Sequence, residues 1–404
     1  MKKEKRSLFN MVFGNKKPKD MNQKSVLKLL SGFNAIFSNV GENIEDNIIA
    51  RECIDTIATH CAKMMPRHYQ EKNGIKNHIQ GEINYILSVK PNPFMTVYDF
   101  LYKTISLLLA QNNEFIFVDI DEKGYLIGLY PLNTLYCKLI EYEGRVWLKF
   151  QFVDGNTYYM EYERIIHLRR FYVSHDFYGD SNSVLNKSIE TQIVADDGIK
   201  NAIKISNSLR GIIKASNSML KNKDVQEMRN EFVKDLLESE KGIAGLDAKL
   251  DFKEINLEPV LLDKEQLEMV NGNIYKYFRI SKEIVESKFS DEDWNAFYES
   301  IIEPLAIQME QAFTNTIFNE KSIKEGHRIE FCVNRIKYAK TETKIKLLRE
   351  VGVLGIIKVD EGREILDLPA LGGEEGNKRL QTLNVINSNL ADNYQGGNKN
   401  GKSN

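Results

Sequence analysis

The 404-residue chain has little cysteine, proline or tryptophan: four cysteines, eight prolines and two tryptophans. The cysteines are widely separated and contain no C-x-x-C pair; they are Cys53, Cys61, Cys137 and Cys332. In a chain of this size such spacing predicts reduced, cytosolic thiols, and it argues against a disulfide framework or a zinc site built on paired cysteines.

Long apolar runs are also missing. The longest, near Ile105 to Ala110, is far shorter than a membrane span. The basic start of the chain lacks an uninterrupted apolar segment and a small-residue cleavage site, so neither a signal peptide nor membrane association is predicted. No charge of one sign dominates either, since 55 basic and 57 acidic residues give a net charge of −2. Any contact with nucleic acid would therefore be local or non-specific.

The composition that is present is that of an ordinary globular protein, with 42% hydrophobic and 28% charged residues. Its length allows two or three domains. The first 40 residues are rich in Lys, Asn and Ser, which predicts a mobile solvated arm, or an arm that touches DNA or a neighbouring subunit. Residues 374–404 are rich in Gly, Asn and Ser and predict a disordered tail.

Periodic apolar residues predict two long helices, at residues 262–279 and 290–318, joined by a short polar segment. Ser290 and Asp293 form a capping-box pattern at the start of the second helix. Pro304 lies in the middle of that helix and predicts a kink, because proline lacks an N–H and clashes with the preceding turn.

The rest of the chain shows both kinds of periodicity. Helices are predicted at residues 44–65, 96–112, 183–209 and 341–351, and a strand at 327–334. Aromatic and β-branched runs between residues 114 and 170 predict a meander of hairpins. Between the helices at 183–209 and 262–279 lies a β-α-β-β module, with strands at 211–216, 243–246 and 250–257 and a charged helix at 223–238.

Three sets of residues could indicate chemistry, and each has a simpler explanation. His60 lies beside Cys61, but no second ligand pair has zinc spacing, so core packing is favoured. His167, His175 and Asp176 could suggest acid–base catalysis, but no activating partner follows from their spacing.

The third set, residues 396–403, matches the phosphate-loop pattern G-x-x-x-x-G-K-[ST]. No apolar strand precedes it and a single residue follows it, whereas the mechanism needs a strand before and a helix after. The sequence therefore predicts no catalytic residue, no cofactor and no metal.

The order of the elements resembles the portal proteins of tailed bacteriophages, and among them the HK97-like family. The resemblance rests on Pro-x-x-Leu, a helix, a loop of about ten residues and a long proline-containing helix that leads to a polar strand. It also rests on residues 355–373, where a small turn precedes an acidic-Arg-Glu helix start and Leu-Pro-x-x-Gly-Gly. Together these stretches extend the resemblance over residues 40–376.

The resemblance implies an α+β portal fold that assembles as a ring. It would have a wing, a two-helix stem, a small α/β clip and a long kinked tunnel helix. The implied parts are an N-terminal arm (1–40), the wing (41–183), stem helix 1 (184–209), the clip (210–258), stem helix 2 (259–280), a tunnel loop (281–290), the tunnel helix with a C-terminal wing or crown part (291–373) and the tail (374–404).

The function that the resemblance implies is a channel for double-stranded DNA at one capsid vertex, used in genome packaging, head–tail connection and DNA ejection. A ring of typically twelve copies would contact DNA non-specifically, and would also contact the large terminase subunit, the major capsid and scaffold proteins and a head–tail adaptor. It would reside in the virion, and in the host cytoplasm during assembly. A non-portal helical scaffold or adaptor, and a nucleotide hydrolase, remain as alternatives.

The tunnel loop is the candidate functional site that the resemblance implies. Its DNA-facing residues would be Ser281, Lys282, Glu283, Glu286 and Lys288. Here basic and acidic side chains balance, which suits transient contact, because every phosphate that a cation neutralises adds affinity for DNA. A plain solvated connection between two helices explains the same residues.

Overall fold

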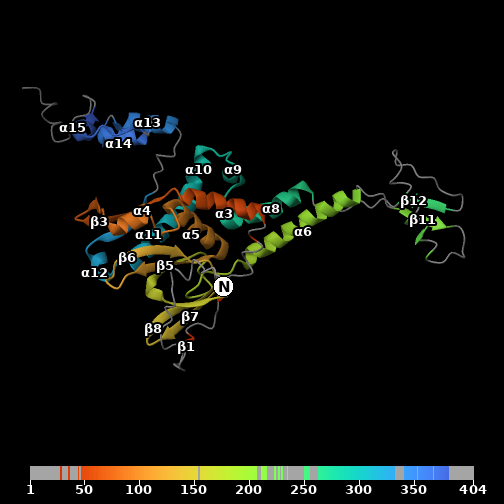
Figure 1. Ribbon diagram of the computed structural model, residues 1–404. Coiled ribbons are helices and arrows are strands. Elements are labelled where there is room, and N and C mark those ends of the chain that lie inside the picture. Colours follow the sequence, from red (N-terminus) through yellow and green to blue (C-terminus); the bar gives the residue numbers. More distant parts are fainter. Residues whose placement is uncertain are drawn as a thin grey trace, which may run out of the picture.

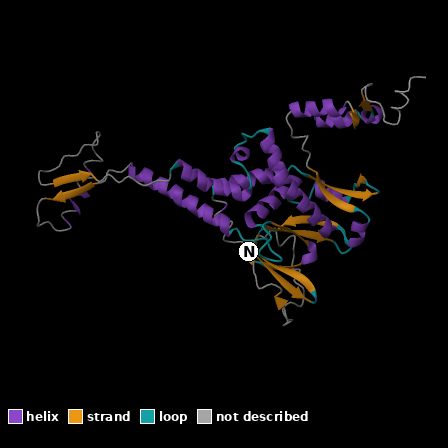
Figure 2. Cartoon of the chain, turned by 180° about the vertical axis from the view of Figure 1, so that it is seen from behind, coloured by secondary structure: helices purple, strands orange, loops and turns teal. Residues whose placement is uncertain are grey.

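The computed structural model describes residues 47–152, 155–206, 263–332, 341–352, 354–366 and 368–381, with Ile44, two short strands before it and parts of residues 211–254. Helices and antiparallel strands are mixed throughout, which confirms the predicted α+β class (Figures 1 and 2). A central body holds most of the elements, and a pair of long helices projects from it (Figure 1). No helix in these ranges combines the length and apolar character needed to cross a membrane.

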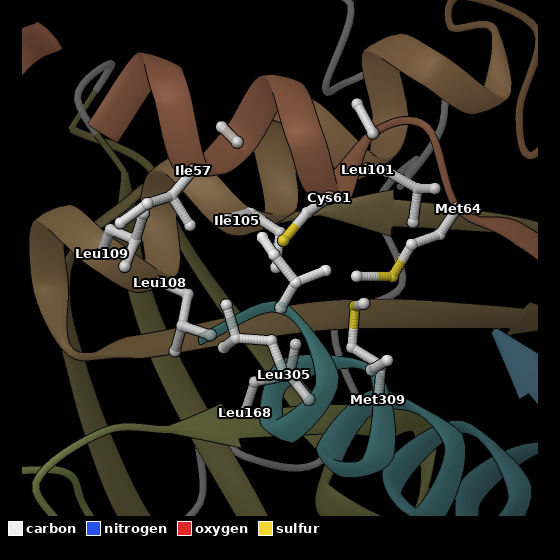
Figure 3. Close-up of a cluster of buried hydrophobic side chains, with 14 of the residues drawn as sticks. Ile57, Cys61, Met64, Leu101, Ile105, Leu108, Leu109, Leu168, Leu305 and Met309 are labelled. Atoms are coloured by element: carbon white, nitrogen blue, oxygen red, sulfur yellow. The ribbon is translucent and has the colours of Figure 1, made fainter. Parts of the chain in front are cut away.

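The main core lies where three helices meet a sheet. The helices are α3 (Ile48–Cys61), α5 (Val97–Gln111) and α11 (Glu303–Ile317). Side chains from all three converge on β10 (Ile165–Arg169), as Figure 3 shows for Ile57, Leu108, Leu168 and Met309. The four-residue spacing of Cys53, Ile57 and Cys61 did predict one buried face, since all three are 0% exposed.

The β-rich block forms two sheets, so the single predicted meander was wrong. One sheet has the order β10-β5-β6, because β10 returns to pair with β5. The other has the order β1-β7-β8-β9, with β2 also paired to β7. The strands are β1 (Lys28–Leu29), β2 (Ala35–Ile36), β5 (Asn113–Ile120), β6 (Leu126–Pro131), β7 (Thr134–Tyr142), β8 (Arg145–Phe152) and β9 (Thr157–Glu161).

Strand β5 belongs to both cores because alternate side chains of a strand point to opposite faces. Ile116 and Val118 are buried in the main core, whereas Phe115 is buried in a second core with Leu148 and Phe150. The predicted N-terminal arm is also partly ordered, since β1 and β2 both pair with β7.

A third sheet, with the order β13-β3-β4, was not predicted as such. Strands β3 (Met65–Lys72) and β4 (Ile75–His78) form a hairpin through Asn73 and Gly74, whose φ angles of 53° and 76° are typical of a tight hairpin turn. Strand β13 (His327–Cys332) pairs with β3 from far along the chain. Helices α4 (Glu82–Ser88) and α12 (Glu320–Lys324) lie near this sheet.

The projecting helices are α6 (Ser183–Ser206) and α8 (Lys264–Phe278), which pack against each other as expected. Asp263 and Gln266 form a capping box at the start of α8. At the far end of the pair, β11 (Gly211–Ala215) pairs with β12 (Leu250–Glu254) (Figure 2). The strand predicted at 243–246 and most of the helix predicted at 223–238 lie outside the described residues.

The long helix after the loop is interrupted. It consists of α10 (Asp291–Phe297), a π-helical turn (Tyr298–Ile302) and α11, which begins one residue before Pro304. The predicted capping box is confirmed, because Asp293 N donates to Ser290 Oγ at 3.1 Å and Ser290 N donates to Asp293 Oδ2 at 2.9 Å. Pro304 thus follows a widened turn of the helix. Because proline has no N–H, it cannot donate the regular hydrogen bond to the preceding turn.

The C-terminal part continues further than predicted. It contains α13 (Thr341–Gly352), β14 (Leu354–Lys358), α14 (Val359–Ile365), α15 (Gly373–Asn377) and β15 (Arg379–Gln381). Since β14 pairs with β15, the tail boundary predicted at residue 374 is too early. Residues 396–403, with the phosphate-loop pattern, lie outside the described residues.

Candidate channel-facing loop

The loop that joins α8 to α10 has a defined local structure. Helix α8 ends at Arg279, whose φ of 58° lies in the left-handed region that often terminates helices. Ile280, next in the chain, is 3% exposed. Ser281 then caps the single-turn helix α9 (Lys282–Val285) by accepting a hydrogen bond from Ile284 N at 3.4 Å. The predicted polar break therefore contains a turn of helix.

The loop sorts its side chains by polarity. Ile284 is 3% exposed, and Val285 and Phe289 are half-buried against the main core. The five predicted site residues are all exposed: Ser281, Lys282, Glu283, Glu286 and Lys288. The apolar anchors therefore fix the loop while its charges face outward.

Glu286 is the centre of the exposed charges. It pairs with Lys288 Nζ at 3.0 Å and with Lys282 Nζ at 3.5 Å. The hydrogen bond from Lys288, together with the charge of Lys282, lowers the pKa of the Glu286 carboxyl. With Glu283, the loop carries two positive and two negative side chains, so its formal charges cancel.

An aromatic contact attaches the loop to the body. Phe289 stacks on Trp294 with ring centroids 5.4 Å apart, and His60 of α3 meets the same tryptophan edge-on at 4.8 Å. Trp294 itself is half-buried. Burial, reinforced by Lys63, lowers the pKa of His60 to about 4, so this imidazole is neutral at pH 7.

The other candidate residues belong to the packed body. No group of three possible metal-ligating side chains occurs in the described part of the chain, and Cys61 is buried in the main core. His167 is buried in the second core, where its ring stacks on Phe115 at 4.3 Å and Nε2 lies 3.2 Å from Asn113 Oδ1. Burial lowers the pKa of His167 well below its usual value. Asp176 is exposed.

A polar cluster that the sequence analysis did not predict lies at the base of the helix pair. Asn112 Nδ2 donates to Tyr277 Oη at 2.9 Å, and Tyr277 Oη donates in turn to Asn182 Oδ1. Asn182 Nδ2 donates to the carbonyl oxygen of Ala110. The cluster joins the end of α5, the residue before α6 and the end of α8. The three residues are far apart in the sequence, and only the fold brings them together.

Fold and site thus define an α+β protein whose body projects an antiparallel helix pair and then presents an exposed, charge-balanced loop. A model of the family described as phage portal protein matches residues 49–367. This chain belongs to that family, which confirms the portal resemblance.

Similar proteins agree with this assignment. The chain is 24% identical over 205 residues to a probable portal protein of Lactococcus phage p2, a match that covers 49% of this chain. The same match covers 50% of the relative, so the chain spans about half the length of that curated protein. Among solved structures, the neck of an empty gene transfer agent particle computed with C6 symmetry has a TM-score of 0.59 at 17% identity, covering 82% of this chain and 93% of that chain. The native neck computed with C12 symmetry has a TM-score of 0.57 at 16% identity, covering 81% and 91%.

Proposed function

We propose that copies of this chain form the ring-shaped channel for double-stranded DNA at one capsid vertex, used in genome packaging, head–tail connection and DNA ejection. Membership of the phage portal family, over residues 49–367, carries the proposal. The chain acts through its geometry and not through catalysis.

The parts of the fold take distinct roles in this ring. Helices α6 and α8 serve as the two stem helices, and the module between them (210–258) is the clip. The body around the main core, with residues 41–183, is the wing. Residues 281–290 are the tunnel loop, and residues 291–373 contain the tunnel helix and the C-terminal wing or crown part.

The structure of the loop supports a channel-facing role. Its charges are outermost and cancel, while Ile284 and Phe289 hold it against the body. A passage for moving DNA must hold the duplex weakly, because each neutralised phosphate releases counterions and adds affinity. A rigid loop with paired charges can touch the duplex repeatedly without gripping it.

A ring of twelve copies is favoured, because a related neck was computed with C12 symmetry. The interface would be heterologous, with each copy presenting one face to the copy before it and another to the copy after it. Such a ring would be part of the virion, would assemble in the host cytoplasm and would meet the large terminase subunit, the major capsid and scaffold proteins and a head–tail adaptor.

Negative-stain imaging of the purified full chain tests the proposal. Rings with a central hole wide enough to pass a DNA duplex are expected. A chain that stays monomeric over a wide range of concentrations and salt, or that forms open filaments without a closed ring, would instead favour a scaffold or adaptor role.

A further inference from the structure

A small surface pocket lies where the end of α8 meets the π-helical turn. Its volume is ≈ 170 Å³. Buried apolar side chains, among them Phe278, Ile301 and Leu305, form its floor, and Phe171, Ser300 and Pro304 lie at its exposed rim. The pocket also contains two arginines, Arg170 and Arg279.

Arg170 is the unusual group in this pocket. Its Nη1 is inaccessible to solvent and has no hydrogen-bond partner. The guanidinium instead lies over the rings of Phe171 at 4.9 Å and Tyr277 at 5.7 Å. Aromatic faces stabilise a cation, but they leave its N–H donors unused. Within the described ranges no carboxylate forms an ion pair with Arg170.

The charge of Arg170 is therefore not offset by an ion pair within the described ranges. Burial lowers the pKa of Arg170 to about 10, and the nearby charge of Arg279 acts in the same direction. Arg170 is still charged at pH 7, and the exposed Arg279 adds a second positive charge at the rim. Two cations at one small pocket with apolar walls attract an anion strongly, because low polarity strengthens electrostatic interactions.

The backbone holds the pocket in a defined shape. Phe171 has a φ of 48°, an uncommon and strained conformation for a bulky side chain. Arg279, with a φ of 58°, is also in the left-handed region, where it ends α8. The surrounding structure holds both conformations, so these two residues have a defined backbone conformation at the rim.

We propose that this pocket receives the carboxylate of an acidic side chain from a neighbouring copy of this chain, an inference that rests on the ring assembly proposed above. A planar guanidinium binds a carboxylate through two parallel hydrogen bonds, and the part of Arg170 that lines the pocket, with Arg279 at the rim, offers such donors. In a heterologous ring each copy offers a different face to its neighbour, so an acid on one face can fill the pocket of the next copy.

A DNA phosphate is the less suitable occupant. The charges of the adjacent loop cancel, which suits weak contact with DNA, whereas a half-buried arginine without an ion-pair partner would bind a phosphate tightly. A carboxylate on a flexible side chain can enter a pocket of ≈ 170 Å³, while a phosphate in the DNA backbone carries its two sugars with it.

Sedimentation velocity of the full chain tests the proposal. Arg170→Met removes the charge and keeps much of the volume, and Arg279→Gln removes the rim charge at an exposed position. The matched control is Arg51→Gln, an exposed arginine on α3 away from the pocket. Both pocket variants should raise the concentration needed for half-assembly by about tenfold, the effect expected for loss of one close charge pair. The control should not change it.

A cross-link identifies the partner. Arg279→Lys places a primary amine at the rim, and a carbodiimide joins it to a carboxylate in contact. Rings assembled from a mixture of isotopically light and heavy chains should give cross-linked peptides of mixed mass, which only a link between copies can produce. A link from position 279 to an acid of the same chain would overturn the proposal.

The remaining outcomes are equally decisive. Wild-type-like assembly of Arg279→Gln would overturn the inference but leave the portal proposal intact. Normal assembly with reduced DNA retention in both pocket variants would assign the pocket to DNA phosphate. Failure of the wild-type chain to form rings would instead refute the proposed function itself.

Discussion

Tyr277 and Asn182 hydrogen-bond to each other although they stand 95 positions apart in the chain. Asn182 directly precedes α6 and Tyr277 lies in the last turn of α8, so the contact closes the base of the projecting helix pair. The segment between them leaves the body and returns to it at one point. Because Asn112 donates to the same tyrosine oxygen, this closure is also attached to α5.

Tyr277→Phe should therefore loosen the base of the helix pair. The change removes the hydroxyl that bonds to Asn112 and Asn182, while these two amides keep their bond to each other, so a loss of about 0.5–1.5 kcal/mol in the free energy of unfolding is expected. Denaturant unfolding measures this loss. Tyr85→Phe, at an exposed tyrosine of α4, is the matched control and should be neutral. Equal stability of the two variants would show that the cluster contributes nothing.

Reversing the loop charges should separate assembly from DNA handling. Lys282→Glu combined with Lys288→Glu leaves four acidic side chains on each loop, and a ring repeats this change in every copy. Exposed ion pairs contribute little to stability, so rings should still form, but DNA retention and packaging should fall through repulsion of phosphates.

The control for this pair is Lys321→Glu with Lys324→Glu, two exposed lysines of α12. Packaging yield and ring content are measured for both double variants. If the loop variant packages normally, the loop does not face DNA. If it fails to form rings, the loop belongs to a subunit interface.

Two aromatic truncations should differ because their burial differs. Phe313 is 0% exposed and packs edge-on against Phe331 at 5.1 Å, so Phe313→Ala should cost about 3–5 kcal/mol of stability. Trp294 is half-buried, and its truncation to Ala should cost less, about 1–3 kcal/mol. Thermal unfolding of the two variants gives the comparison. A larger loss at Trp294 would mean that the Phe289–Trp294 contact holds more of the body than its burial indicates.

Acid should destabilise the fold in a defined window. Burial, with the nearby charge of His327, lowers the pKa of His68 to about 4, and its Nε2 lies 2.9 Å from His327 Nδ1. An unfolded histidine binds a proton below about pH 6.5, whereas this folded one does so only near pH 4. The unfolded state therefore binds more protons between these values, and stability falls as the pH drops from about 6.5 to about 4.

Denaturant unfolding at pH 7.5 and pH 5 measures this dependence. His68→Gln, which cannot take up a proton, should lose less stability over that interval than the wild type. His60, whose pKa is also lowered to about 4, contributes a similar dependence that remains in the variant. A wild type equally stable at both pH values would contradict the expectation.

Local patterns predicted the local elements well. Apolar periodicity located α5 and α8 to within a few residues, and the Ser290–Asp293 capping box is formed as expected. The loop residues that the portal resemblance singled out are all exposed. These features depend on residues that are close together in the chain, so a single sequence is enough to predict them.

The errors arose where distant segments meet. Strand β3 is partly exposed and begins with Met65-Pro66, so its alternation is weak, and its partner β13 lies more than 250 residues away. The return of β10 to β5, which splits the predicted meander into two sheets, is likewise a tertiary choice. The isolated guanidinium of Arg170 has no local signature at all, because its environment comes from three separate segments.

The π-helical turn sets the rotational phase between the two halves of the long helix. It accommodates one residue more than an α-helix would, and each residue of an α-helix turns the next by about 100°. Trp294 therefore meets His60 of α3 at the edge of the main core, while Met309 and Phe313 lie within that core, at 0% exposure each. A chain shortened by one residue within this turn could form a regular helix, yet its second half would be rotated out of phase with the core. The extra residue of the π-helical turn therefore sets the rotation of α11 relative to α10 and the loop before it.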